Sequence, residues 1–246
     1  MTSAALTINQ KVLNSNSSRI YNATTTAAAS DITLTNQVSG ETLQLSNSAA
    51  TSSKNVGSYS ISNLSGVTIS DQAGANASSG ALAANYTLTG GTHSFAINPK
   101  AVNITGTRQY DGTTSIPASD ISGITGTVNT ETLTMSSGLG STSSANVGTY
   151  NLTDTSAGTL ALGNGSNGGL ASNYTLTGGT QDYTITQRVL TSSGSKTYDA
   201  NTNALAADIT LSNLVSGEAL NHSGTASISS ANAGSYTITN LAGITI

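Results

Sequence analysis

The sequence predicts an all-β protein made of tandem sandwich modules, and three observations lead to this fold class. A block of about 88 residues recurs almost three times along the 246-residue chain. Apolar and polar residues alternate in short stretches such as 41–45 and 208–211, which is the period of a strand with one buried and one wetted face. Turn-forming residues such as 89–92 separate the stretches. Roughly six to eight short strands per repeat are typical of an immunoglobulin-like β-sandwich.

Three motifs define the repeats, and repeat 3 contains the first two of them. The first is Tyr21-Asn22-Ala23, which returns as Tyr110-Asp111-Gly112 and Tyr198-Asp199-Ala200 at spacings of 89 and 88 residues. The second, Asn-(Val/Ala)-Gly-(Ser/Thr)-Tyr, ends at Tyr59, Tyr150 and Tyr236, and the third, Asn-Tyr-Thr-Leu-Thr-Gly-Gly-Thr, contains Tyr86 and Tyr174. This period exceeds the 20–50 residues of common solenoids and matches a small domain in tandem. A β-solenoid is the alternative architecture, and it would need coils of about 20 residues.

The repeats divide the chain into four predicted segments. These are 1–9, the tail of a preceding module; 10–98, module 1; 99–186, module 2; and 187–246, a truncated module 3. Residues 6–8 align with 95–97 and 183–185, the last strand of a module. Residues 244–246 align with 67–69, and the third motif does not follow them. We therefore expect an excerpt from a longer protein.

The junctions between modules contain no flexible tether. At 97–102 and 185–190, an apolar strand end is followed by two or three polar residues and then by an apolar strand start. A chain without a Gly/Ser linker leaves adjacent modules little freedom, so the modules should abut in an extended rod.

Composition excludes several classes of partner and chemistry. Only 7% of residues are charged and the net charge is −4, so nucleic acid is not an expected partner. No apolar run approaches 18 residues, so no membrane insertion is expected. The absence of cysteine rules out disulfides, thiol chemistry and cysteine-based zinc sites.

Every aromatic residue occupies a repeated position, which favours a structural role over a catalytic one. Aromatic rings at such positions are expected to anchor each small core, with tyrosine hydroxyls reaching a polar partner. A repeated carbohydrate contact is the alternative. The motif residues predicted to be structural are Tyr21, Tyr110, Asp111, Gly112, Tyr198, Asp199, Tyr59, Tyr150, Tyr236, Tyr86 and Tyr174.

No residue pattern points to catalysis, a metal or a cofactor. Asp111, Asp120 and Glu131 are the candidate calcium ligands, but these carboxylates do not follow the closely spaced pattern of a calcium loop. His93 aligns with Gln181, so a general base or zinc ligand would exist in one repeat only. No Gly-x-Ser-x-Gly nucleophile elbow is present. The chain is therefore not expected to be an enzyme.

The sequence 110–114 (Tyr-Asp-Gly-Thr-Thr), followed by 146–150 and 170–176, resembles the YDG-type repeat. Such repeats occur in large bacterial surface proteins, including filamentous-haemagglutinin-like adhesins and two-partner-secreted exoproteins, often near related MBG modules. The resemblance covers essentially the entire chain, although repeats 1 and 3 carry alanine in place of the motif glycine. It implies an exported, multi-module protein of the bacterial cell surface, and it supplies no ligand.

These inferences predict structural stalk or spacer repeats of an exported adhesin, which project a distal binding region and contribute weak adhesion. The expected partners are neighbouring modules of the same longer chain and a host or cell-surface glycan or protein. One alternative is a module that itself binds glycan or another surface ligand, through loops such as 71–79 or 163–169. A less favoured one is an accessory region of a carbohydrate-active enzyme.

Overall fold

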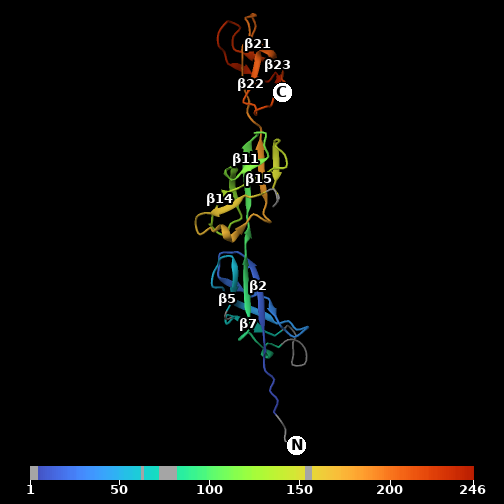
Figure 1. Ribbon diagram of the computed structural model, residues 1–246, viewed down its shortest axis with the longest axis vertical. Coiled ribbons are helices and arrows are strands. Elements are labelled where there is room, and N and C mark those ends of the chain that lie inside the picture. Colours follow the sequence, from blue (N-terminus) through green and yellow to red (C-terminus); the bar gives the residue numbers. More distant parts are fainter. Residues whose placement is uncertain (1–4, 62–63, 72–81, 153–156) are drawn as a thin grey trace. The chain divides into compact units, whose positions relative to one another are not determined.

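The computed structural model describes residues 5–61, 64–71, 82–152 and 157–246 (Figure 1). These residues form short strands joined by turns, and their helical segments are single 3₁₀ turns of three residues. Among the residues described, no helix has the length and apolar character needed to cross a membrane. The predicted all-β fold class is confirmed.

Packing divides the chain into two compact units. The first comprises Met1–Gly106, Ile116–Ser141 and Asn151–Asp182, and the second comprises Thr107–Ser115, Thr142–Tyr150 and Tyr183–Ile246. The first unit therefore contains repeat 1 (residues 10–98) and most of repeat 2 (residues 99–186). The second unit contains repeat 3 (residues 187–246) and three short segments of repeat 2, residues 107–115, 142–150 and 183–186.

Repeat 1 is built from two main sheets. Its elements are β1 (Lys11–Val12), β2 (Asn14–Ile20), β3 (Thr26–Ala28), η1 (Ala29–Asp31), β4 (Leu34–Thr35), β5 (Gln44–Ala50), β6 (Gly57–Ser60), β7 (Val67–Ser70), η2 (Ala83–Asn85), β8 (Tyr86–Thr87) and β9 (His93–Asn98). One sheet has the order β4-β2-β9-β6 and the other β3-β5-β7, while β1 pairs with β8. In β9, His93, Phe95 and Ile97 are buried and alternate with more exposed residues, which is the predicted strand period.

Repeat 2 follows the same plan. Its elements are β10 (Lys100–Ala101), β11 (Asn103–Gln109), β12 (Ser115–Pro117), η3 (Ala118–Asp120), β13 (Ile121–Thr125), β14 (Leu133–Ser137), β15 (Leu139–Ser141), β16 (Gly148–Asn151), β17 (Ala161–Asn164), η4 (Ala171–Asn173), β18 (Tyr174–Thr175) and β19 (Gln181–Thr186). The sheet β13-β11-β19-β16 corresponds to β4-β2-β9-β6. The counterpart of β5 is split into β14, which pairs with β17, and β15, which pairs with β12.

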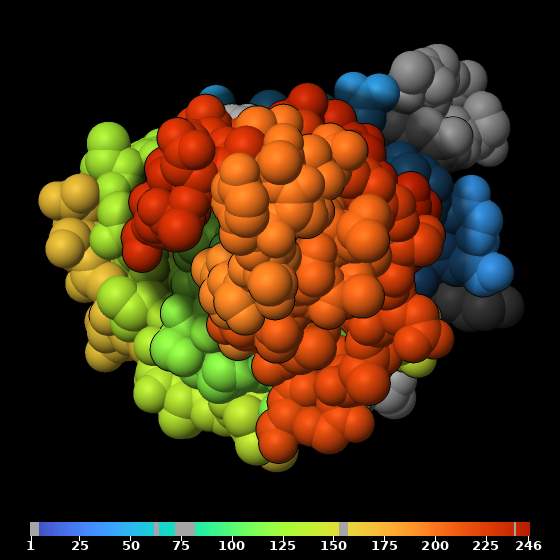
Figure 2. Space-filling model, turned by 90° about the horizontal axis from the view of Figure 1, so that it is seen from above, coloured from blue at the N-terminus to red at the C-terminus, as the bar shows by residue number. Residues whose placement is uncertain are grey.

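Repeat 3 contains fewer strands. Its elements are β20 (Thr191–Gly194), β21 (Asn203–Leu205), η5 (Ala206–Asp208), β22 (Ile209–Ser212), β23 (Ser223–Ile228), β24 (Ile238–Asn240) and β25 (Ile244–Thr245). β20 pairs with β22, while β23 pairs with β21, β24 and β25. Its small core includes Ala204, Ile209 and Ala226. Figure 2 shows the surface of this repeat in orange and red.

Every strand pairing given above joins two strands of the same repeat. A solenoid would instead pair successive coils along the chain, so the pairing agrees with the predicted β-sandwich modules and not with the solenoid alternative. In the first unit a buried cluster joins Tyr21, Phe95 and Ile97 from repeat 1 with Leu133 and Tyr174 from repeat 2.

Candidate functional site at the repeat junction

The first motif folds into a tight turn whose polar side chain binds the backbone two residues later. Asn22 Oδ1 accepts hydrogen bonds from Thr24 N (3.2 Å) and Thr24 Oγ1 (2.9 Å). Asp111 Oδ1 accepts the same pair from Thr113, at 2.9 and 3.0 Å. Asn and Asp commonly form such turns because the short side chain reaches its own downstream amide.

The residue after the Asn or Asp adopts a left-handed backbone in all three repeats. Its φ is 62° at Ala23, 77° at Gly112 and 63° at Ala200. Glycine enters this region without steric cost, whereas alanine does so at a cost of roughly 1–2 kcal/mol. Repeats 1 and 3 therefore adopt the same turn without the motif glycine, because the Asn or Asp side chain stabilises the turn through its hydrogen bonds to the backbone.

A basic residue two positions before the motif tyrosine closes the same turn. Arg19 donates to the carbonyls of Thr24 and Thr26, and Arg108 donates to those of Thr113 and Ser115. The Arg19 guanidinium also lies 5.5 Å from the centre of the Phe95 ring. The Arg19 and Arg108 side chains therefore stabilise the turn.

The turn directs Tyr21 of repeat 1 toward Glu131 of repeat 2. Tyr21 is 1% exposed, and its hydroxyl donates to Glu131 Oε1 at 2.8 Å. Tyr174 donates to Oε2 of the same carboxylate at 2.5 Å and accepts from Val128 N at 3.0 Å. The two tyrosine rings contact edge to face, with centroids 5.4 Å apart. One carboxylate is therefore shared by a tyrosine of its own repeat and a tyrosine of the preceding repeat.

Asn173 makes a second polar connection at this junction. Its side chain is fully buried, and Oδ1 accepts from Val56 N at 2.9 Å while Nδ2 donates to Asn55 Oδ1 at 3.1 Å. The equivalent Asn85 of repeat 1 is exposed. The second motif of repeat 1 thus contacts the third motif of repeat 2. The site is named the Glu131 junction and comprises Tyr21, Asn55, Glu131, Asn173 and Tyr174.

The second unit contains a related but more open contact. Tyr110 donates to Glu218, and Tyr110 and Glu218 occupy the repeat positions of Tyr21 and Glu131. Glu218 is exposed and Tyr110 half-buried. A Cβ added at Gly112 would lie 3.0 Å from Val215 Cγ1, so the glycine permits close approach of the two segments.

Burial and the carboxylate keep the junction tyrosines protonated. Burial and then the hydrogen bond to Glu131 raise the pKa of Tyr174 to about 12, and the same two causes raise the pKa of Tyr21 even further above its usual value near 10. For Tyr110 the hydrogen bond to Glu218 is the main cause of a raised pKa.

These shifts predict a loss of stability at alkaline pH. The neutral tyrosine is favoured in the folded state, so its contribution is complete below pH 10 and falls as pH rises toward the folded pKa. Tyr174 alone should account for about 2–3 kcal/mol between pH 10 and 12. Urea unfolding at a series of pH values measures the change. A Tyr174→Phe variant should show a shallower decline; an equal decline in both proteins would contradict the assignment.

The tyrosines of the second motif are local anchors outside this shared site. Tyr59 donates to Asn55 O at 2.7 Å, and Tyr150 donates to Asn146 O at 2.6 Å. A Cβ added at Gly57 would lie 3.0 Å from the Tyr59 hydroxyl, so the glycine lets this ring fold back over the turn in repeat 1.

The expectation that every repeated ring anchors a core is wrong for two of them. Tyr21, Tyr86, Phe95, Tyr174 and Tyr183 are at most 5% exposed, but Tyr198 and Tyr236 of repeat 3 are 65% and 37% exposed. The burial of Tyr21 depends on Glu131 and Tyr174, which come from another repeat. The position in the repeat therefore does not determine burial by itself.

The histidines and carboxylates have structural contacts. His93 contacts Leu88 O through Nε2 at 3.0 Å, and the equivalent Gln181 donates to Leu176 O, so both side chains fasten the same turn. Asp31 and Asp208 accept from the backbone N–H at the start of their 3₁₀ turns. Within the described part of the chain, no group of three or more His, Asp or Glu side chains is arranged to hold a metal ion.

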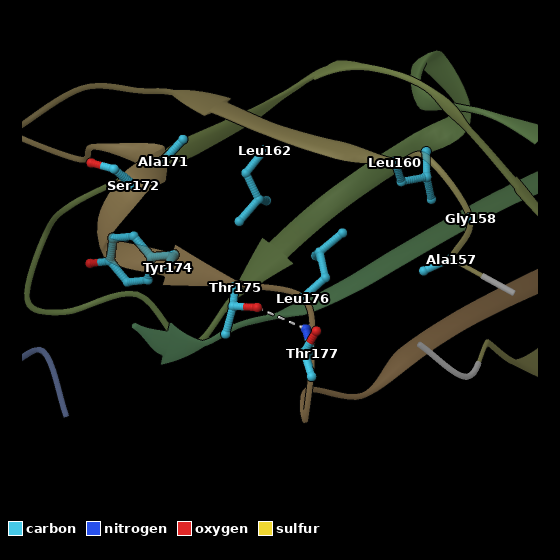
Figure 3. Close-up of a pocket in the computed structure, with 10 residues that line it drawn as sticks. All are labelled: Ala157, Gly158, Leu160, Leu162, Ala171, Ser172, Tyr174, Thr175, Leu176 and Thr177. Atoms are coloured by element: carbon cyan, nitrogen blue, oxygen red, sulfur yellow. Dashed lines mark hydrogen bonds between the residues drawn. The ribbon is translucent and has the colours of Figure 1, made fainter. Parts of the chain in front are cut away.

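A hollow of about 360 Å³ lies beside the Glu131 junction in repeat 2 (Figure 3). Leu162 and Leu176 face one another across it, and Tyr174 lies at one side. Thr177 N donates to Thr175 Oγ1 at 3.1 Å. The ten residues that line it include no charged side chain and no histidine, so its lining supplies no carboxylate, ammonium or imidazole group.

Of the two loops predicted to be able to recognise a ligand, 71–79 and 163–169, the structure describes the second in full. Residues 72–79 of the first loop lie outside the described residues. In the second, Ser166 N donates to Thr132 Oγ1 at 2.7 Å and Asn167 donates to Thr130 O at 2.9 Å. The loop 163–169 thus packs against the segment that carries Glu131.

Comparison with known families identifies the repeat. The model of the YDG domain matches three times, over residues 2–94, 96–186 and 181–246. No curated protein and no solved structure matches the chain. Because the three matches cover nearly the entire sequence, the chain belongs to the YDG domain family.

Proposed function

We propose that these YDG repeats form a stalk or spacer of an exported bacterial cell-surface adhesin. The observation that carries the proposal is the shared Glu131 carboxylate, to which adjacent repeats each contribute a buried tyrosine. Repeats that are joined directly in this way resist rotation relative to one another, and a spacer needs this stiffness. The repeated positions of the aromatic residues also favour a surface-spacing role over a single binding site.

The spacer role predicts an elongated particle in solution. Modules of about 88 residues have a diameter of roughly 30 Å, so nearly three end to end should give a radius of gyration near 28 Å. Small-angle X-ray scattering measures this quantity. A value near 18 Å, which is expected of one collapsed domain of this length, would contradict the spacer role.

A matched control tests whether the direct junction matters. Six Gly/Ser residues inserted between Asn98 and Pro99 should give a scattering profile typical of flexibly linked domains. The unmodified chain should retain the profile of a stiff particle. Identical profiles for the two proteins would show that the junction does not restrict the repeats.

The exported location is tested separately on cells that produce the parent protein. Antibodies against the repeats should label intact cells, and protease added to intact cells should remove the signal. A glycan array probes the alternative binding role. Labelling only after cell lysis, or specific glycan binding by the purified repeats, would replace the proposal.

A further inference from the structure

The loop 163–169 of repeat 2 contains two Asn-Gly pairs, Asn164-Gly165 and Asn167-Gly168. Asparagine followed by glycine is prone to deamidation, because glycine has no side chain to hinder attack of its backbone nitrogen on the preceding carboxamide carbon. The reaction is favoured by an exposed asparagine and by a following N–H that no acceptor holds. These two conditions distinguish the two pairs.

Asn164 is held in place by hydrogen bonds. It is the last residue of β17, and its Oδ1 accepts from Ala171 N at 2.8 Å. The following N–H, that of Gly165, donates to Gly169 O at 3.0 Å. Both the carboxamide and the nitrogen that would attack it are therefore engaged, so attack requires the loop to open.

Asn167 meets both conditions. It is exposed, and together with Gly168 it forms the centre of a turn that is closed by the hydrogen bond from Gly169 N to Ser166 O, at 3.1 Å. Within the described residues, the Gly168 N–H donates to no acceptor. The Asn167 carboxamide donates to Thr130 O at 2.9 Å. Release of this bond frees the side chain to rotate toward the Gly168 nitrogen.

The Asn167-Gly168 pair lies beside the Glu131 junction. A Cβ added at Gly168 would lie 4.0 Å from Glu131 Oε1 and 4.0 Å from Lys54 Nζ. Lys54 belongs to repeat 1, and its Nζ is 4.0 Å from Glu131 Oε1. A negative charge gained at the Asn167-Gly168 pair would therefore act on a buried carboxylate and on the cation next to it.

We propose that Asn167 is a site of spontaneous deamidation that weakens the junction between repeats 1 and 2 as the protein ages. The Gly168 backbone nitrogen loses its proton to hydroxide and attacks Asn167 Cγ. A new C–N bond closes a succinimide ring, and the carboxamide nitrogen takes up a proton and leaves as ammonia. Water then opens the ring at either carbonyl, which gives aspartate or isoaspartate. In total, one water molecule is consumed and one ammonia molecule is released.

The product cannot keep the contact that Asn167 makes. A carboxylate has no N–H to donate to Thr130 O, so two acceptors would face each other. The added charge also repels the Glu131 carboxylate and competes with it for Lys54. The loop should therefore separate from the segment 130–132, which carries Glu131.

Peptide mapping by mass spectrometry, after incubation of the intact chain at mildly alkaline pH, tests the chemistry. Asn167 should convert into aspartate and isoaspartate at a rate that rises with pH, because hydroxide removes the Gly168 proton. Asn164 is the matched control in the same loop, and it should convert at least about ten times more slowly. An Asn167 that stays intact, or that reacts no faster than Asn164, would overturn the proposal.

Hydrogen exchange of the same samples measures the effect on the junction. The amides of Thr132 and Ser166, which donate between the segment and the loop, should lose protection in the aged chain. The Val56 amide, which donates to Asn173 across the junction, should lose protection as well. Asn167→Asp introduces the charge without ageing and should give the same losses.

Asn167→Gln is the control for ageing, because its longer side chain keeps a carboxamide but forms a ring with the next nitrogen much more slowly. Its protection should be the same before and after incubation. Equal losses in aged Asn167→Gln would overturn the proposal. Protection that stays unchanged in both the aged chain and Asn167→Asp would overturn it as well.

Discussion

Tyr21→Ala is expected to lower the free energy of unfolding by about 4 kcal/mol, which is typical of truncating a large aromatic side chain in a core. Tyr21 is 1% exposed, packs edge to face on Tyr174 and donates to Glu131. The substitution removes the ring contact and also leaves one carboxylate oxygen with fewer donors. Urea unfolding followed by circular dichroism measures the loss.

The matched control is the same substitution at the equivalent position of repeat 3. Tyr198 is 65% exposed, so Tyr198→Ala should cost less than about 0.5 kcal/mol. Tyr21→Phe keeps the ring and removes only the hydroxyl, and it should cost about 1.5–3 kcal/mol because the acceptor is a carboxylate. Equal losses for Tyr21→Ala and Tyr198→Ala would show that Tyr21 is not anchored by repeat 2.

Glu131→Ala should be similarly destabilising, by about 3–5 kcal/mol. Glu131 is 6% exposed, and its two oxygens accept from Tyr21 and Tyr174. Without the carboxylate, two buried hydroxyls lose their acceptor, and each unsatisfied group costs about 1–3 kcal/mol. Removing one partner of a buried charged network has a cost in the same range. Differential scanning calorimetry of the intact chain gives this value.

Glu218→Ala is the control for this result. Glu218 occupies the same repeat position, but it is exposed and accepts from the half-buried Tyr110, so its loss should cost less than about 1 kcal/mol. A local readout is the amide of Val56, which donates to Asn173 across the junction and should exchange faster in Glu131→Ala. Unchanged Val56 protection in a destabilised variant would place the effect of Glu131 within repeat 2 only.

The fold was predictable because its signals are local. The alternation of apolar and polar residues along 93–98 and 181–186 predicts strands, and both segments form strands in the structure. The division of the β5 counterpart into β14 and β15 was not predicted. There the register shifts between Met135 and Ser137, and Gly138 follows with a φ of 100°, which is a bulge that the alternation of residues does not reveal.

The Glu131 junction was predicted only in part. Tyr21 and Tyr174 are predicted to be structural, but their shared partner Glu131 lies 110 and 43 residues away, and the spacing within a repeat does not show which surfaces meet. The sequence offers Glu131 as a candidate calcium ligand and does not point to Asn173. The identical octapeptide could have pointed to Asn173, yet Asn85 occupies the same position and is exposed. The difference arises from the neighbouring repeat rather than from the local sequence.

The sharing of Glu131 also has a consequence for a chain under mechanical tension. Tyr21 belongs to repeat 1, whereas Glu131 and Tyr174 belong to repeat 2. Opening repeat 1 therefore removes one donor from a buried carboxylate, and opening repeat 2 removes the acceptor of the buried Tyr21 hydroxyl. Neighbouring repeats should then yield cooperatively, as elements with a nearest-neighbour coupling energy do. Glu218 is exposed to water, so the coupling it provides is weaker. When the chain is pulled from its ends, repeat 3 should therefore unfold first. Repeats 1 and 2 should unfold together at a higher force.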